Sequence, residues 1–153
     1  MRETLLVLHI IGVAAWLGAN FTMAFAGSMT GEADASTRRW WAGAQGSLAR
    51  IYKSVAATLV LITGIWLVLD DGGLSMGSTF VSIGFAAIII GVLFGIFVYG
   101  PGCRKIADAI DEGDDASEKS VNNRLAGVGG IETLILVVTI VAMVAEWGAR
   151  APS

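Results

Sequence analysis

The chain has little charge and very few of the residues that bind metals through sulfur or imidazole. Only 15% of its 153 residues are charged, whereas soluble domains carry about 25%. A single cysteine, Cys103, excludes a disulfide within the chain and a cysteine-cluster metal site. A single histidine, His9, excludes the multi-histidine sites that zinc and copper enzymes usually need. Lysine and arginine number 10 against 13 aspartate and glutamate, so we expect no nucleic-acid partner.

Apolar residues are abundant, at 55% of the chain with a mean hydropathy of +0.72. A helix needs roughly 20 mostly apolar residues to cross a hydrocarbon core about 30 Å thick. We therefore predict an all-α, single-domain bundle over residues 1–153 with the lipid bilayer as its solvent. The predicted membrane spans lie at about residues 5–26, 48–69, 78–100 and 125–147.

The distribution of positive charge predicts how the bundle is oriented. The termini and the connection over residues 70–77 hold only Arg2 and Arg150. The two longer connections and their flanks hold eight cations: Arg38, Arg39, Arg50, Lys53, Arg104, Lys105, Lys119 and Arg124. Because cationic short loops stay in the cytoplasm, we predict a multi-pass protein of the bacterial cytoplasmic (inner) membrane with both termini outside.

The second long connection, residues 102–123, is predicted to form a helical hairpin that turns near Gly113. Asp115 and Glu118 have the spacing of a capping box, so the last helix should begin before it enters the membrane. Pro101 marks a kink in the third helix or its exit from the membrane.

A line of polar side chains follows one face of the first helix. His9, Trp16 and Asn20 recur at helical steps, and this face should point into the bundle because polar groups are costly in lipid. His9 and Met143 are expected at similar depth. Such a pair could bind the iron of haem b or a copper ion, with Met76 as a further candidate ligand for copper. The simpler alternative is that His9 hydrogen-bonds a neighbouring helix while Met143 fills the core.

Two opposite charges are predicted to meet inside the membrane. Lys53 and Glu132 each lie five to seven residues from the cytoplasmic end of a predicted span, so they reach a similar depth. An ion pair would reduce the desolvation cost that each charge suffers alone. The alternatives are that Lys53 snorkels to the interface, or that Glu132 takes part in a proton or cation relay.

Glycine is also plentiful, with 20 residues. Gly84, Gly91 and Gly95 share one stripe of the third predicted helix, and small residues let helices approach closely in lipid. We expect this stripe to pack helices of the same chain, with a dimer interface as the alternative.

Three short motifs resemble those of a known group of proteins. The segments 8–12 (LHIIG) and 15–18 (AWLG) resemble the opening of an uncharacterised family of small bacterial integral membrane proteins. The segments 63–67 (TGIWL) and 100–106 (GPGCRKI) are similar to later motifs of that family. A more distant resemblance is to the membrane domain of the copper-resistance protein CopD and to the haem-biosynthesis protein HemJ. It implies a four-helix membrane fold and, for the distant relatives, haem b or copper, for which only His9 matches a ligand.

No nucleophile, base and orienting residue occur together in a pattern typical of an enzyme. The sequence therefore favours a non-enzymatic integral membrane protein, either a homo-oligomer or an accessory subunit that binds other membrane subunits. The alternatives are a haem- or copper-binding membrane protein that uses His9, and a small ion or solute transporter.

Overall fold

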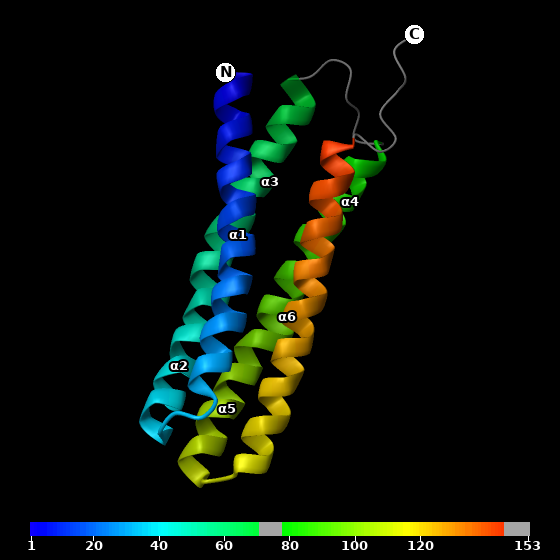
Figure 1. Ribbon diagram of the computed structural model, residues 1–153. Coiled ribbons are helices and arrows are strands. Elements are labelled where there is room, and N and C mark those ends of the chain that lie inside the picture. The colour runs from blue at the N-terminus through cyan, green and yellow to red at the C-terminus, as the bar shows by residue number, and fades with distance from the viewer. Residues whose placement is uncertain (71–77, 146–153) are drawn as a thin grey trace.

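The computed structural model describes residues 1–70 and 78–145, which fold into helices with no strand in these two ranges. Four long helical rods run up and down the bundle (Figure 1). The rods are, in chain order, α1 (Arg2–Thr30); α2 (Ala35–Ser47), η1 (Leu48–Tyr52) and α3 (Lys53–Asp70); α4 (Thr79–Phe94), η2 (Gly95–Tyr99) and α5 (Gly100–Glu112); and α6 (Asp115–Val144). Each rod is long and apolar enough to cross a membrane. The predicted all-helical fold with four candidate spans is confirmed.

Two tight connections, residues 31–34 and 113–114, lie at the same end of the bundle, which we call the loop end (Figure 1). The opposite end, called here the terminal end, holds Met1 and the last turns of α3 and α6. Every rod extends beyond its predicted span at the loop end. At the terminal end of the fourth predicted span, Trp147 lies outside the described residues.

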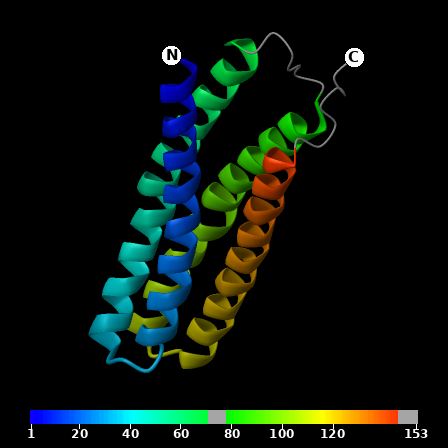
Figure 2. The same cartoon turned by 45° about the horizontal axis from the view of Figure 1, so that its top comes forward.

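The helices pack as two pairs. α1 packs mainly against α3, and α4 packs against α6, while α2 and α5 join the pairs at the loop end. The pairs diverge toward the terminal end in both ribbon views (Figure 2). Contacts between the pairs are therefore concentrated in the half of the bundle nearer the loops.

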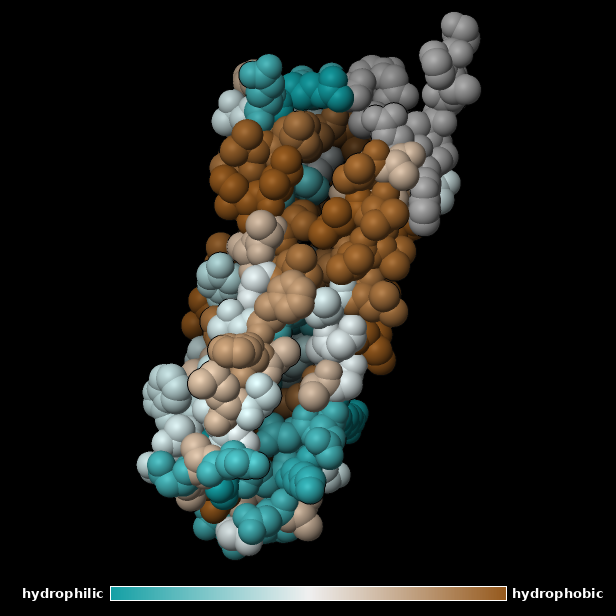
Figure 3. Space-filling view, viewed as in Figure 1, coloured by the Kyte–Doolittle hydropathy of each residue, from teal (hydrophilic) through white to brown (hydrophobic). Residues whose placement is uncertain are grey.

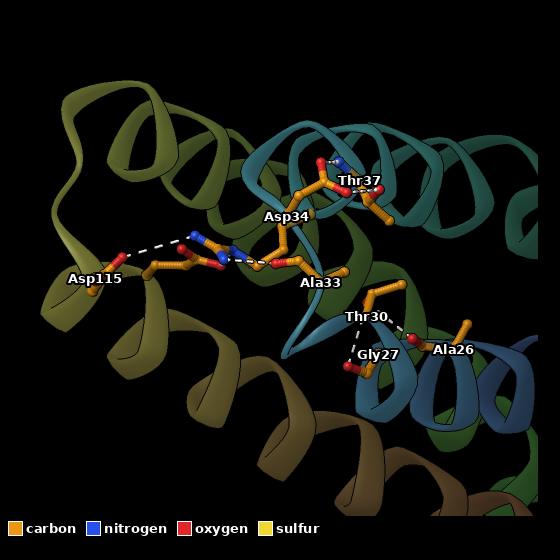
Figure 4. Close-up of polar contacts among 9 residues, drawn as sticks. Ala26, Gly27, Thr30, Ala33, Asp34, Thr37 and Asp115 are labelled. Carbon is orange, nitrogen blue, oxygen red and sulfur yellow. Dashed lines mark hydrogen bonds and ion pairs between the residues drawn. The ribbon is translucent and has the colours of Figure 1, made fainter.

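Aspartates cap the helices that begin at the loop end. The Asp34 carboxylate accepts a hydrogen bond from the backbone N–H of Thr37 (Figure 4), and Asp114 does the same for Ser117. Side-chain hydrogen bonding for Asp34, and backbone hydrogen bonding for Asp114, lower the pKa of each carboxyl below its usual value. The predicted capping box at Asp115 is therefore wrong by one position, because Asp114 is the capping residue.

The turn near Gly113 is confirmed, since this glycine has a φ of 71°, a left-handed conformation that costs glycine least. Pro101 does not end the third rod, which continues to Glu112. It follows the π-helical turn η2 instead. A proline removes one backbone N–H and crowds the carbonyl four residues earlier, which explains why the helix widens here.

The surface has the polarity of a membrane protein. On the face seen in Figure 3, apolar residues lie between hydrophilic residues gathered at the loop end and a smaller hydrophilic group at the terminal end. Many large apolar side chains are exposed on every rod, including Ile10, Phe25, Ile62, Phe97 and Leu134. In water this surface would be a strong liability for aggregation, whereas a lipid bilayer would solvate it.

Candidate functional site

The buried carboxylate of Glu132 is the centre of a polar cluster inside the bundle. Glu132 is 2% exposed, and its Oε2 lies 2.6 Å from Lys53 Nζ. The indole N–H of Trp16 donates to Oε1 over 2.8 Å, and the Tyr99 hydroxyl donates to Oε2 over 3.2 Å. The Lys53 ammonium also lies 4.5 Å from the centre of the Tyr99 ring. These four residues are called the charge cluster below.

Each rod supplies one member of the charge cluster, so the cluster ties all four rods together. An ion pair taken out of water is stabilising only when further hydrogen bonds and good geometry offset its desolvation. Both Glu132 oxygens have such bonds, from Trp16 and from Tyr99. Lys53 and Glu132, which the sequence predicted as a pair, are thus brought together at a well-satisfied site.

Two π-helical turns place the cluster residues. Lys53 directly follows η1 and its backbone N–H reaches back to the carbonyl of Leu48, whereas Tyr99 is the last residue of η2. The two π turns contact each other. An extra residue in a helical turn rotates every following side chain around the helix axis, and such turns are frequent at functional sites. Here they determine which side chains face Glu132.

Asn20 lies one turn of α1 closer to the loop end than Trp16 and is also buried. Its Nδ2 donates to Thr133 Oγ1 over 3.3 Å, next to Glu132 on α6. Its Oδ1 is buried and has no hydrogen-bond partner among the described residues. A buried acceptor without a donor is costly, so the Asn20 carbonyl is a candidate contact for a bound molecule.

A large cavity leads from the loop end toward the charge cluster. Its volume is about 850 Å³, within the range of pockets that hold drug-sized ligands. It is called the loop-end pocket and is lined by Asn20, Phe21, Met23, Ala24, Gly27, Ser28, Gly31, Arg38, Gln45, Tyr99, Asp115, Glu118, Lys119, Asn122, Asn123, Leu125, Ala126, Gly129, Gly130 and Thr133. Along α6 the lining extends from Asp115 to Thr133, a rise of about 27 Å.

Ion pairs from α2 to α5 and α6 lie at the outer end of the pocket. Arg38 Nε lies 3.0 Å from Glu118 Oε1, and the same guanidinium reaches the carboxylate of Asp115 at 3.8 Å (Figure 4). The next residue, Arg39, pairs with Asp111 of α5 at 2.9 Å. These contacts attach α2 to α5 and α6, so they hold the pocket mouth in shape.

His9 is buried on the terminal-end side of the charge cluster, away from the loop-end pocket. Its Nδ1 lies 3.0 Å from Thr63 Oγ1. Because the Thr63 hydroxyl donates to the Leu59 carbonyl over 2.6 Å, we assign the imidazole proton to Nδ1, which leaves Nε2 as the acceptor. This state is compatible with metal ligation. It also agrees with the simpler alternative, in which His9 bonds a neighbouring helix.

Met143 has different surroundings from His9. Its methyl carbon lies 2.8 Å from the place where a Cβ of Gly84 would be, whereas a Cβ of Gly64 would meet the His9 ring. Residues 1–70 and 78–145 contain no group of three or more His, Cys, Asp or Glu side chains that could hold a metal ion. Met76 lies outside these residues. Haem or copper binding through His9 stays a prediction.

The glycine stripe of the third rod packs within the chain. A Cβ at Gly91 would overlap the Trp16 ring, and a Cβ at Gly84 would press on Met143. Gly95 has more room, since the nearest atom to a Cβ there is the Ala49 carbonyl oxygen at 4.0 Å. The absence of a side chain at Gly91 therefore leaves room for the Trp16 ring, whose N–H donates to Glu132.

Sequence reasoning missed Tyr99 and three amide side chains of the pocket, those of Gln45, Asn122 and Asn123. Tyr99 lies at the end of an apolar run and next to Gly100 and Pro101, where an interfacial aromatic is the usual interpretation. The signal that was available is the proline, because a widened turn before it changes which residue faces inward.

Comparison with known proteins gives no family to which the chain can be assigned: it matches no family model, no curated protein and no solved structure. The resemblance to small bacterial membrane proteins therefore stays a prediction, and the functional argument depends on the geometry of this site.

Proposed function

We propose that this chain is a non-enzymatic integral membrane protein that moves a small solute or ion across the bilayer. The loop-end pocket is its access route, and the charge cluster is the inner end of that route. One observation carries the proposal: a cavity that starts among the loop-end charges reaches Tyr99 and Thr133, which contact or adjoin Glu132.

A purely structural ion pair would need no such cavity. Ionisable groups inside a membrane mark solute and proton pathways by default, because burying them in a closed bundle is costly. Tyr99 both lines the pocket and donates a hydrogen bond to Glu132. It therefore connects the pocket to the ion pair.

The loop-end pocket does not extend beyond the charge cluster. Its lining reaches Tyr99 and Thr133, and no residue of α1 between His9 and Trp16 lines it. We interpret this state as open toward the loop end. Passage to the other side then requires the α1/α3 and α4/α6 pairs to move against each other, as in alternating access.

The proposed setting is the bacterial cytoplasmic membrane with the loop end inside. Assembly as a homo-oligomer or with other membrane subunits stays a prediction, for which the exposed apolar faces provide the surface.

The orientation can be tested with reporter fusions. A fusion inserted at Gly113 should report a cytoplasmic location, and a fusion after residue 153 should report the outside, because eight cations flank the loop-end connections and two flank the others. The same location for both reporters would contradict the four-span topology.

Transport can be tested in sealed proteoliposomes by two probes, protons followed with an internal pH dye and radiolabelled glucose. We expect at least one probe to enter faster than in protein-free vesicles. Tyr99→Phe removes only the hydroxyl that connects the pocket to Glu132, and it should slow entry about tenfold, the effect of losing roughly 1.4 kcal/mol.

Tyr52→Phe is the matched control, since Tyr52 is the other tyrosine of the chain and is exposed on the surface. It should leave the flux unchanged. Equal entry of both probes into wild-type and protein-free vesicles would overturn the proposed function.

A further inference from the structure

We infer that the loop-end pocket binds a neutral polyhydroxyl group, carried either by a free solute or by a lipid headgroup. The inference rests on the proposed function and names the chemical class of the molecule that occupies its access route. It is carried by the amide side chains of the pocket, by one buried acceptor without a partner, and by the balance of charge along the lining.

Carboxamides dominate the polar lining inside the mouth. Four of them, Asn20, Gln45, Asn122 and Asn123, face the cavity from α1, α2 and α6. Each carboxamide offers two N–H donors and one carbonyl acceptor, so a cluster of them matches a ligand whose groups both donate and accept. Hydroxyl groups have this property, and Tyr99 and Thr133 add hydroxyls at the inner end.

Asn20 supplies the observation that points to a bound molecule. The side chain is 5% exposed and is fixed by its bond to Thr133, yet its Oδ1 has no donor. The oxygen has almost no accessible surface in this conformation. Because Asn20 lines the pocket, a turn of its carboxamide would let a ligand hydroxyl at the inner end satisfy this oxygen. Since leaving a buried acceptor unpaired costs stability, occupancy of this position is favoured.

Charges along the lining cancel. Arg38 and Lys119 contribute two positive charges, and Asp115 and Glu118 contribute two negative ones, with Arg38 already paired to both acids. Behind Tyr99, Glu132 is neutralised by Lys53. An ion that entered would lose hydration without gaining a counter-charge, so a neutral ligand is favoured.

The remaining wall of the pocket is apolar. Its position is compatible with two sources of the ligand, a free solute and a lipid headgroup. Phe21, Ala24, Leu125 and Ala126 line the pocket, and they suit the C–H face of a sugar ring. Phe21 and Ala126 are also exposed on the outside of the bundle, in the part that lipid surrounds. A polyhydroxyl group could therefore arrive from water at the mouth or as a lipid headgroup.

Equilibrium binding to the detergent-purified protein tests the inference without any gradient or transport. The probe is radiolabelled glucose, with gluconate and protonated glucosamine as charged analogues of the same size. We expect saturable glucose binding that unlabelled glucose displaces, and displacement by either charged analogue at least about tenfold weaker. In nanodiscs, glucosyldiacylglycerol compared with diacylglycerol tests the lipid source.

Asn20→Leu should weaken binding about tenfold, because it removes the acceptor and keeps a similar volume. Asn122→Ala should weaken binding about threefold. Asn122 is half-buried, so we expect this variant to fold. Thr22→Val is the control, since Thr22 is exposed on the same helix and bonds the carbonyl of Gly18 in its own helix. It should bind like the wild type.

Saturable binding of glucose or of the glucosyl lipid supports the inference, and whichever form binds identifies the source. Absence of saturable binding by both, or tighter binding of a charged analogue, would overturn it. Proton flux without polyhydroxyl binding would leave the proposed function standing and refute the inference. Binding of the polyhydroxyl group without flux of either probe would support the inference and refute the proposed function.

Discussion

Replacing Lys53 by methionine is expected to destabilise the protein in detergent by about 3–5 kcal/mol, the range measured when one partner of a buried ion pair is removed. The reason is that the Glu132 carboxyl would lose its counter-ion inside the bundle and would retain only the Trp16 and Tyr99 hydrogen bonds. Equilibrium unfolding of the purified variant, followed by the loss of helical signal, measures the effect.

Glu132→Gln should be destabilising as well, since the Lys53 ammonium is 4% exposed and would lose its counter-ion. The double substitution should recover much of both losses, which is the signature of coupling between the two sites. In the double variant the glutamine carbonyl still accepts from Trp16, and the Tyr99 oxygen can accept from the amide. Simple addition of the two single effects would show that the residues act independently, contrary to their 2.6 Å contact.

Gly91→Ala is expected to destabilise the bundle by about 1–3 kcal/mol, the usual effect of overpacking a core. The added methyl group would overlap the Trp16 ring, so the indole must move and its hydrogen bond to Glu132 must weaken. Unfolding of the purified variant in detergent measures the loss.

Gly95→Ala is the matched control, because it lies one turn away on the same stripe and a Cβ there has its nearest atom at 4.0 Å. It should be neutral or slightly stabilising, since alanine favours a helix over glycine. If Gly91→Ala is as stable as Gly95→Ala, Trp16 is not held by close packing against Gly91.

The four long apolar helices could be predicted from the sequence because they depend on a local property. The length of an apolar run sets whether a helix can cross a bilayer, and the runs ending near Ala26 and Leu69 needed no tertiary information. The helices are longer than the runs because their polar extensions at the loop end are stabilised by contacts between α2, α5 and α6. Such contacts leave no trace in a hydropathy profile.

The ion pair could also be anticipated, because depth along a helix follows from counting residues. Lys53 and Glu132 required only opposite sign and similar depth. Trp16 was expected on the inward face of the first helix, but the position of Tyr99 depended on rotation around the helix axis. Tyr99 faces Glu132 after a π turn, and a regular helical projection gives the wrong face for every residue beyond such a turn.

The pocket could not be predicted, because a cavity is a property of side chains from several helices at once. Asn20 was expected to face inward, but the sequence does not indicate whether its Oδ1 accepts a hydrogen bond from another side chain or has no donor. Asn122 and Asn123 belong to the helical hairpin that the sequence predicts over residues 102–123, and nothing in that prediction places them on a pocket. Their position on the lining depends on residues of α1 and α2 that lie across the pocket from α6, and the ion pair of Arg38 with Glu118 joins α2 to α6 there.

Reaction of engineered cysteines with a charged, membrane-impermeant thiol reagent tests whether water reaches the charge cluster from the loop end. Cys103→Ala provides the background, because Cys103 is the only native cysteine. Gly130→Cys places a thiol on the pocket lining, roughly 22 Å along α6 from Asp115, and a Cβ there meets no neighbouring atom within 4 Å.

Ile131→Cys is the matched control at the same depth, since Ile131 is 54% exposed and is absent from the pocket lining. A thiol must ionise in water to react. With reagent added at the loop end of sealed vesicles, we expect Gly130→Cys to react at least about tenfold faster than Ile131→Cys. Equal rates, or no reaction at Gly130→Cys, would contradict a water-filled route to Glu132.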